Sequence, residues 1–271
     1  MSERPSVSVV IPSGDASRDA NLERLQEDLR TQTLPPTEVE IVRGVAPNGR
    51  ARNVGVSRTV GDILVFLDDD VRLGSPDVLE RLVSHLQADP TLGMVGTAQQ
   101  LPPDSTPFQR RCARQISRSE SPVVSVLTES DMVTTQCCAM RRAVLDEVGG
   151  FHDRILRGVD PELRHRVRAA GYRIAVVPEA WHYHPMPGSL RALLRMAWRN
   201  GHASAYARRH FPETVLYNPE GHVAEFEAAR PLSRRVLRNA GDLVSSLLSG
   251  HWIGLLYRVT YVSGNLMGSV R

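Results

Sequence analysis

The sequence predicts an α/β fold, built on a doubly wound and mostly parallel sheet that is flanked by helices. Short apolar runs typical of buried strands alternate with segments whose apolar residues recur at helical spacing. This repeated strand–helix order is the pattern of a parallel sheet with helices on both faces. One apolar run, residues 62–67, leads directly into three carboxylates, Asp68, Asp69 and Asp70. Such sheets bind ligands at the carboxyl ends of their strands, so the acidic triplet stands where a site is expected.

The first hundred residues contain four of the expected strands and three of the expected helices. Leu22, Leu25 and Leu29 recur at helical spacing. A later helix is expected to begin with Ser75 as its N-cap and Pro76 in its first turn. The strands are expected over 7–12, 38–42, 62–68 and 93–100, and the helices over 21–30, 49–60 and 75–87.

The second half of the chain is expected to add further strands and helices. Residues 101–131 are rich in Pro, Ser and Arg and indicate a loop with one helix. The helix expected over 142–151 ends at two adjacent glycines. The expected elements are a strand over 132–141, helices over 142–151 and 160–172, a strand over 173–178, and mostly helix from Ser189 onward.

Composition and charge exclude some functions and indicate a kind of partner. All 33 basic residues are arginines, so a Schiff-base lysine and a phosphate-loop lysine are both excluded. Residues 186–271 carry 11 arginines against 5 acidic residues, a net charge of +6, whereas residues 1–185 carry −3. The basic last third favours an anionic partner, such as a phosphorylated acceptor or a membrane surface.

The expected compartment is the cytoplasm. Three cysteines, two of them adjacent, make no disulfide or metal framework and favour a reducing environment. The first residues lack a basic segment followed by a long apolar run, so no signal peptide is expected. The alternative location is peripheral, on the inner face of the membrane.

The acidic triplet has two interpretations when it is taken alone. It can be a solvated turn that also caps the following helix. It can equally hold Mg²⁺ or Mn²⁺, because these cations prefer carboxylate oxygens and usually bind together with a substrate's phosphates. Since alternate side chains of an extended segment point the same way, Asp68 and Asp70 are the pair that can converge on one ion.

Several motifs in a fixed order resemble the family 2 glycosyltransferases of the GT-A fold. They are Ala-Arg-Asn-x-Gly at 51–55, Gly-Asp before the apolar strand, the acidic triplet, Gly-Gly-Phe at 149–151, an acid at 160 and a histidine beyond the next strand. The resemblance implies a GT-A type, Rossmann-like domain over residues 1–188, with a donor half of about 1–100 and an acceptor half of about 101–188. A helical C-terminal extension follows over 189–271.

The resemblance also implies a set of site residues. Asp160 matches the general base of an inverting transfer, although it can also be the N-cap of its helix. His184 falls where the family has a further metal or phosphate ligand, and His182 is a weaker candidate beside it. Arg52 can instead be a surface arginine of an amphipathic helix. The implied nucleotide-sugar-binding residues are Pro12, Arg52, Asn53, Asp68 and Asp69, and the implied ligands of the divalent metal are Asp70, Asp68 and His184.

Three departures from the family pattern limit what the resemblance implies. The second strand is followed by Arg43 and Gly44, with no acid to bind the nucleotide base, so the nucleotide is not identified. The first acid of the family's Glu-Asp pair is Val159, with Glu162 close by. The chain lacks the Gln-x-x-Arg-Trp element of processive synthases, which favours transfer of a single sugar to an acceptor hydroxyl.

Two other functions remain open at this stage. A nucleotidyltransferase would use similar carboxylates and metal, but the residues after the first strand make a poor phosphate loop. A non-catalytic module that binds nucleotide sugars would explain the missing base-binding acid. Nucleic acid is not among the expected partners, and the acceptor is expected to be anionic or lipid-linked.

The C-terminal extension contains a basic amphipathic helix and an apolar segment. Arg191, Arg195 and Arg199 recur every four residues opposite an apolar face, which indicates either a surface helix packed on the sheet or a basic stripe toward a membrane. Residues 243–270 have few charges but are interrupted by Gly, His and Arg. A span needs about 20 mostly apolar residues, so peripheral membrane contact or contact with a hydrophobic partner is favoured over a span.

Overall fold

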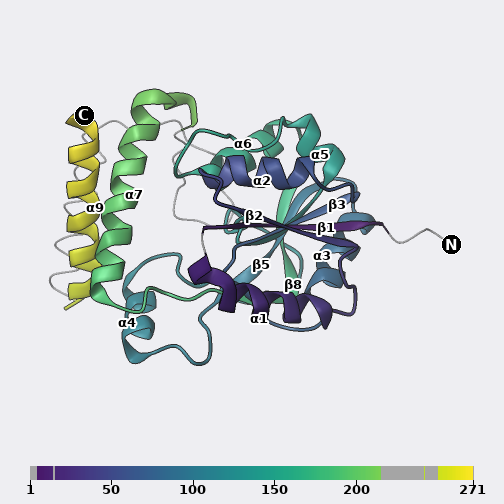
Figure 1. Cartoon of the computed structure of the whole chain (residues 1–271), viewed down its shortest axis with the longest axis horizontal. Helices are drawn as coiled ribbons and strands as arrows, with labels where there is room; N and C mark the ends of the chain where they lie inside the picture. Colours follow the sequence, from purple (N-terminus) through teal and green to yellow (C-terminus); the bar gives the residue numbers. More distant parts are fainter. Residues whose placement is uncertain (1–4, 15, 215–240, 242–249, 271) are drawn as a thin grey trace.

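The protein forms a mixed eight-stranded sheet with helices on both faces and a pair of helices beyond one edge of the strands (Figure 1). The computed structural model describes residues 5–14, 16–214, 241 and 250–270. The strand order is β2-β1-β3-β7-β5-β8-β4, and β6 also pairs with β8. The predicted α/β class with a mostly parallel sheet is confirmed.

Five strands of the sheet share one direction. β1 is parallel to β2 and β3, and β5 is parallel to β8. β7 separates the two parallel groups and is antiparallel to both of its neighbours, and β4 and β6 are antiparallel to β8. The strands are β1 Val7–Ser13, β2 Glu38–Arg43, β3 Ile63–Leu67, β4 Arg72–Leu73, β5 Leu92–Gln100, β6 Thr128–Glu129, β7 Cys137–Arg141 and β8 Arg173–Tyr183.

The helices of the described residues cover the two faces of the sheet with separate cores. α1 and α3 pack on one face, and α5 and α6 pack on the other. Leu22, Leu25 and Leu29 of α1 are buried against the sheet, as their spacing predicts. The helices are η1 Ala16–Arg18, α1 Asp19–Arg30, α2 Asn48–Ser57, α3 Val78–Ala88, α4 Pro107–Gln115, α5 Arg142–Glu147, α6 Val159–Ala169, α7 Leu190–His210, η2 Pro212–Thr214 and α9 Trp252–Val270.

Two expected details of the strands and helices are wrong. Ser75 is not the N-cap of α3, because its hydroxyl donates to Asp77 at 2.5 Å and the helix begins only at Val78. The strand expected over 132–141 begins at Cys137, and the residues before it form a loop that reaches the acidic corner of the molecule. By contrast, the strand expected over 173–178 continues to Tyr183.

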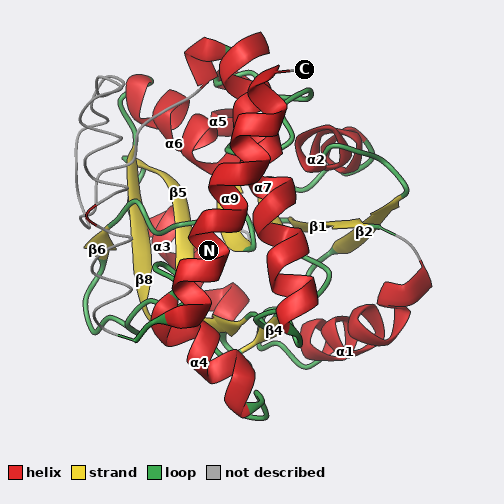
Figure 2. Ribbon diagram, turned by 90° about the vertical axis from the view of Figure 1, so that its left-hand side faces the viewer, coloured by secondary structure: helices red, strands yellow, loops and turns green. Residues whose placement is uncertain are grey.

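The C-terminal extension is represented by α7 and α9, which lie side by side (Figure 2). Their backbones approach closely because glycines face the neighbouring helix. A Cβ on Gly201 would lie 2.0 Å from the carbonyl oxygen of Tyr261, and one on Gly264 would lie 2.4 Å from that of Trp198. Tyr261 also donates a hydrogen bond to Ser204 at 2.8 Å. Residues 243–249 of the predicted apolar segment lie outside the described residues.

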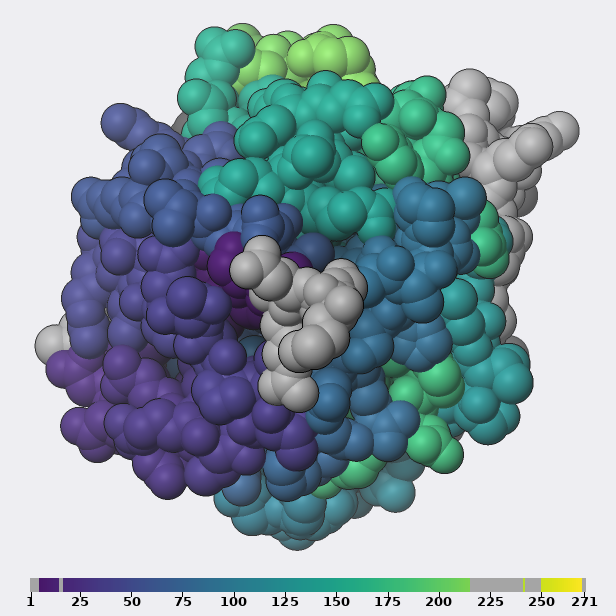
Figure 3. All heavy atoms as spheres, turned by 90° about the vertical axis from the view of Figure 1, so that its right-hand side faces the viewer, coloured from purple at the N-terminus to yellow at the C-terminus, as the bar shows by residue number. Residues whose placement is uncertain are grey.

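The helix pair stands beyond the carboxyl ends of the parallel strands (Figure 1). The opposite face of the molecule, at the amino end of β1, shows mainly purple, blue and teal segments, with light-green atoms of the chain beyond residue 185 at the top, and no part of the yellow α9 (Figure 3). Within the part of the chain that the structure describes, no helix is both long enough and apolar enough to cross a membrane.

Candidate active site

The acidic triplet lies at the carboxyl edge of the sheet, immediately after β3. β1 ends beside it at Ser13, and β8 ends beside it just before His184. The backbone N–H of Asp68 donates to the carbonyl of Gln136 at 3.1 Å, so the first acid continues the β3–β7 ladder. The triplet therefore stands on a rigid element, as the sequence predicts.

Asp68 pairs with Arg52 of α2. The guanidinium Nη2 lies 2.7 Å from the Asp68 Oδ1, and Arg52 is only 2% exposed, so the interpretation as a surface arginine is wrong. The guanidinium also lies 5.7 Å from the centre of the Phe151 ring. Burial, with smaller contributions from the carboxylates of Asp70 and Asp160, raises the pKa of Asp68 to about 6, although the charges of Arg52 and His184 act to lower it.

Asp69 and Asp70 share one cation and differ in their other partners. Ser13 donates to Asp69 at 2.9 Å, and Arg18 of η1 donates to Asp70 at 3.3 Å and lies 3.9 Å from Asp69. His184 Nε2 lies 3.3 Å from the other oxygen of Asp70. Burial alone would raise the pKa of Asp70, but the hydrogen bond and charge of His184 and the charge of Arg18 hold it below its usual range.

The two histidines at the end of β8, His182 within the strand and His184 just beyond it, have their pKa values shifted in opposite directions. Burial alone would lower the pKa of His184, but the carboxylates of Asp70 and Asp68 raise it above its ordinary value. His182 is buried inside the sheet, where its Nδ1 lies 2.7 Å from the Thr97 hydroxyl. Burial lowers the pKa of His182 to about 3, so this ring is neutral. Of the two, only His184 contacts the acidic triplet.

Asp160 lies in the first turn of α6 and is not its N-cap. The N-cap is Gly158, and no side chain caps this helix end. The Oδ1 of Asp160 accepts from the Thr135 backbone N–H at 3.2 Å and from the Thr135 hydroxyl. Behind it, the buried Arg164 donates to the carbonyl of Val133 at 2.5 Å. Burial lowers the pKa of Arg164 to about 10, so it remains a cation near Asp160.

Thr135 connects the two acidic groups. Its hydroxyl and N–H bind Asp160, and its carbonyl accepts from Arg52 at 3.4 Å. The same Nη2 of Arg52 binds Asp68. Thr135 is 2% exposed, so the loop between β6 and β7 links Asp160 to Asp68, through Arg52, in one hydrogen-bonded network.

The remaining predicted site residues lie near the corner without contacting the triplet. The amide of Asn53 exchanges hydrogen bonds of 2.8 and 2.9 Å with the backbone of Phe151, so in this structure it fixes the Gly-Gly-Phe turn. Pro12 is buried in β1 opposite Val42. The assignment of Asn53 and Pro12 to the donor site stays a prediction.

The departures from the family pattern have structural counterparts. Arg43, which ends β2, forms an ion pair of 2.7 Å with Asp19, so a cation stands where the base-binding acid is expected. Val159 is buried among apolar side chains. Glu162 binds Arg166 at 2.6 Å on the next turn of α6, so it does not replace the missing first acid.

The predicted metal ligands fit a divalent cation in chemistry and spacing. Among the residues that the structure describes, no three His, Cys, Asp or Glu side chains already converge as a metal site. However, two ligands of an octahedral ion at about 2.1 Å stand about 3.0 Å apart, and the Asp70 and His184 atoms are separated by 3.3 Å. Asp68 interacts electrostatically with both. Asp70, His184 and Asp68 are therefore the residues that would hold the ion.

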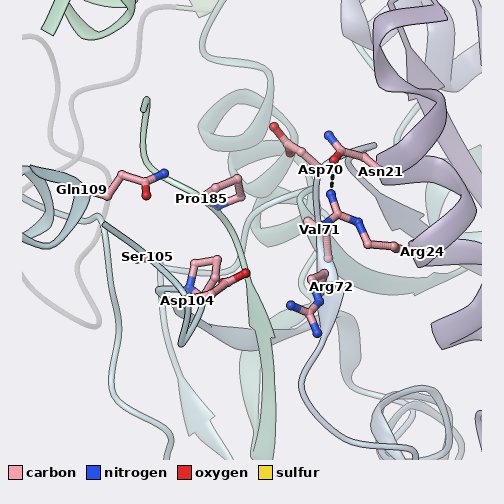
Figure 4. Close-up of a pocket in the computed structure, with 10 residues that line it drawn as sticks. Asn21, Arg24, Asp70, Val71, Arg72, Asp104, Ser105, Gln109 and Pro185 are labelled. Atoms are coloured by element: carbon pink, nitrogen blue, oxygen red, sulfur yellow. Dashed lines mark hydrogen bonds between the residues drawn. The ribbon is translucent and has the colours of Figure 1, made fainter. Parts of the chain in front are cut away.

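Asp70 also lines a recess of about 170 Å³ (Figure 4). Asn21 and Arg24 of α1 lie on one side of it, facing Asp104 and Gln109 on the other. The lining carries both signs of charge and several hydrogen-bonding groups. A recess with this lining suits a polar ligand next to the acidic corner.

Three residues of this corner were not predicted from the sequence. Ser13 follows the first strand, so its place at the carboxyl edge could have been inferred from the strand end. Arg18 lies in a short 3₁₀ turn, and Thr135 lies in the segment that was expected to be a strand. No local sequence pattern points to Arg18 or Thr135, because their partners are distant in the sequence.

Arg52→Met should destabilise the fold, and more so at alkaline pH. Folded Asp68 keeps its proton to about pH 6, whereas the unfolded side chain loses it near pH 4. A raised carboxyl pKa therefore lowers stability as the pH rises through this window, and loss of the cation increases that cost. Breaking a buried pair costs about 3–5 kcal/mol, and Asp68 is 24% exposed, so we expect about 3 kcal/mol at pH 8 and less at pH 5.

Urea unfolding at the two pH values measures this difference. Arg50→Met, at an exposed position of the same helix, is the control and should leave stability nearly unchanged at both. An equal loss for Arg52→Met at pH 5 and pH 8 would contradict the electrostatic account.

The sequence is similar to known glycosyltransferases. The family model described as "Glycosyltransferase like family 2" matches residues 1–221. The O-antigen chain rhamnosyltransferase RfbN of Salmonella typhimurium is 26% identical over 141 residues, 49% of this chain and 44% of that protein. The pre-mycofactocin glycosyltransferase of Mycobacterium tuberculosis is 31% identical over 173 residues, 61% of this chain and 36% of that protein. The matches thus span less than half the length of these relatives.

Solved structures share the fold. The mannosyltransferase PcManGT from Pyrobaculum calidifontis, in complex with GDP-Man and Mn²⁺, superposes with a TM-score of 0.58 at 17% identity, covering 98% of this chain and 88% of that one. GalNAc-T7 with UDP, GalNAc and Mn²⁺ gives a TM-score of 0.52 at 14% identity, covering 83% and 53%. The predicted GT-A type fold is therefore confirmed, and the chain belongs to the family 2 glycosyltransferases.

Proposed function

We propose that the protein transfers a single sugar from a nucleoside-diphosphate sugar to an acceptor hydroxyl with inversion, using Asp160 as general base and a divalent cation at the acidic triplet. The observation that carries this proposal is the network in which Thr135 binds Asp160 and also binds Arg52, the partner of Asp68. This network supports the proposal because it links the Asp160 carboxylate to the acidic triplet through only two residues, Thr135 and Arg52. Membership of a glycosyltransferase family disfavours nucleotidyl transfer.

In the proposed reaction, Asp160 accepts the proton of the acceptor hydroxyl as its oxygen attacks the anomeric carbon. The bond from that carbon to the diphosphate breaks in the same step, and the nucleoside diphosphate leaves with the bonding electron pair. Thr135 occupies the Oδ1 of Asp160, so the other oxygen is the one presented to the acceptor. General base catalysis of this kind is worth about 100- to 10,000-fold in rate.

Asp70, His184 and Asp68 are the proposed metal ligands, with Mn²⁺ or Mg²⁺ as the cation. When bound, the ion would stabilise the negative charge that grows on the leaving diphosphate. Asp69 and Arg52 are proposed to contact the donor directly. PcManGT and GalNAc-T7 were solved with Mn²⁺ and with a guanine or uridine nucleotide, which supports a nucleotide-sugar donor without identifying it.

The acceptor is proposed to be anionic or lipid-linked, and the place of action to be the cytoplasm or the inner membrane face. The arginine-rich extension supports both statements. The curated relatives act on O-antigen chains or on pre-mycofactocin, as their names state, and this chain matches less than half of each.

Asp160→Asn should abolish transfer while donor binding stays nearly intact. The amide cannot take the acceptor proton, so kcat should fall by about 100- to 10,000-fold. Turnover assays with calorimetric donor titration measure the two effects. Asp153→Asn, in the exposed loop before α6, is the control. Full activity of Asp160→Asn would remove it as the base, and donor binding without any turnover in the native protein would indicate a non-catalytic module.

Thr135→Val should lower kcat about tenfold with unchanged donor affinity. The valine keeps the shape but loses the hydroxyl that orients Asp160, and a hydrogen bond to a charged group is worth about 1.5–3 kcal/mol. Thr135→Ser retains the hydroxyl and should restore kcat. Thr134→Val is the control, because the Thr134 hydroxyl binds Gln136 instead. A serine variant as slow as the valine variant would argue for packing in place of orientation.

Metal should be needed for nucleotide binding at the acidic corner. Thermal unfolding against a panel of nucleoside diphosphates should show stabilisation that requires Mn²⁺ and disappears on chelation, because bound ligand raises the midpoint. Asp70→Asn should lose this stabilisation, while Asp104→Asn, across the same recess, should keep it. Transfer that survives exhaustive chelation would overturn the metal assignment.

A further inference from the structure

We infer that α9 and the arginines of α7 form a docking face for an anionic membrane surface. The inference deepens the membrane contact in the proposed function and depends on no step of sugar transfer. It identifies the surface that makes the contact. The sequence alone did not decide whether the basic amphipathic helix packs on the sheet or faces a membrane.

The outward side of α9 is apolar. Trp252, Leu256, Val259 and Leu266 follow one another at spacings of three, four or seven residues, so they lie along one stripe of the helix. Trp252 and Leu266 are 58% and 63% exposed, although side chains of this size are normally buried. Val262 and Met267 are also exposed and extend the stripe. Ser263 lies on the same stripe between Val259 and Leu266, and the exposed large side chains on either side of it are apolar. A largely apolar exposed surface of this kind marks an interaction site.

The opposite side of α9 is fixed to the protein. Gly264 and Gly268 leave no room for a Cβ against α7, and Gly254 leaves none against Gln115. The side chain of Gln115, at the end of α4, accepts from the backbone N–H groups of Ile253 and Gly254 at 3.0 and 3.1 Å. The apolar stripe is thus held in a set orientation, with its glycine face toward the domain.

The charge around the stripe identifies the occupant. Neither α7 nor α9 contains Asp or Glu, and together they carry six arginines. Arg191, Arg195 and Arg199 are exposed and recur every four residues along α7. Trp198, which is 41% exposed, lies between two of them. An apolar face beside arginines, with no acid on either helix, matches acyl chains below anionic headgroups, where each basic residue adds to binding.

The position of the pair agrees with a surface contact. Both helices lie in front of the sheet when the molecule is viewed from their side (Figure 2), and they stand beyond the edge that carries the acidic triplet (Figure 1). The described helices are not long and apolar enough to span, so α9 would lie in the plane of the interface.

Sedimentation of the full chain with lipid vesicles tests the inference. The chain should bind vesicles of phosphatidylcholine mixed with phosphatidylglycerol, bind phosphatidylcholine alone more weakly, and dissociate as salt is raised. The double variant Leu256→Gln and Leu266→Gln should bind the mixed vesicles at least tenfold less. The control Val60→Gln and Val126→Gln, at two exposed valines of the catalytic domain, should bind like the native chain.

A second variant tests the charge. Replacing Arg191, Arg195 and Arg199 with Gln should reduce binding on mixed vesicles to the level on phosphatidylcholine. Far-UV circular dichroism and the unfolding midpoint confirm that each variant is folded. Native chain that stays in the supernatant, or α9 variants that bind normally, would overturn the inference. A dimer that is detected by light scattering and lost in the α9 variant would also overturn the inference. In that case a second copy of the chain would occupy the face. None of these measurements involves sugar or nucleotide, so their failure leaves the proposed transfer untouched.

Discussion

Three adjacent carboxylates at the end of β3 repel one another, and the surrounding structure is arranged to balance them. Every acid of the triplet has a partner: Arg52 for Asp68, Ser13 for Asp69, His184 for Asp70, and Arg18 for both Asp69 and Asp70. These partners come from α2, β1, η1 and the end of β8, so the triplet is compatible with folding only when four separate segments meet at one edge. The balance is partial, since burial still raises the pKa of Asp68 to about 6. That residual cost is what a bound cation would offset.

The same corner explains why Arg52 is buried and why Thr135 matters. A buried guanidinium needs acceptors, and the Nη2 of Arg52 binds both the Asp68 carboxylate and the Thr135 carbonyl, while its buried Nε has no hydrogen-bond partner among the described residues. Because Thr135 must present its carbonyl to Arg52, its N–H and hydroxyl are directed to Asp160. The position of Asp160 is therefore linked to the charge balance at Asp68 through one residue, Thr135. The proposed transfer would use this link, since a base and a leaving group must act on one carbon.

The sequence predicted the frame of this site better than its connections. The alternation of strands and helices, and the position of the triplet at the carboxyl end of β3, follow from local patterns, and the structure has both. Thr135 was hidden because residues 132–136 have strand-like composition, but β7 pairs with β3 only from Cys137 onward. The cap at Ser75 failed because a neighbouring carboxylate, Asp77, competes for its hydroxyl. The partners of Asp69 and Asp70 depend on tertiary contacts across more than 50 residues, which local periodicity does not encode.

The C-terminal extension is joined to the acceptor side of the site by aromatic contacts. Phe211, which follows α7, packs on His152 with ring centres 5.0 Å apart and lies under the guanidinium of Arg154 at 4.8 Å. Arg157 lies 5.9 Å from the ring of Tyr261 in α9. These contacts hold the loop that leads into α6, where Asp160 lies three residues beyond Arg157. The predicted boundary at 188/189 thus separates two parts that share an interface at the site. The loop before α6 is therefore packed between the proposed base and the C-terminal helices.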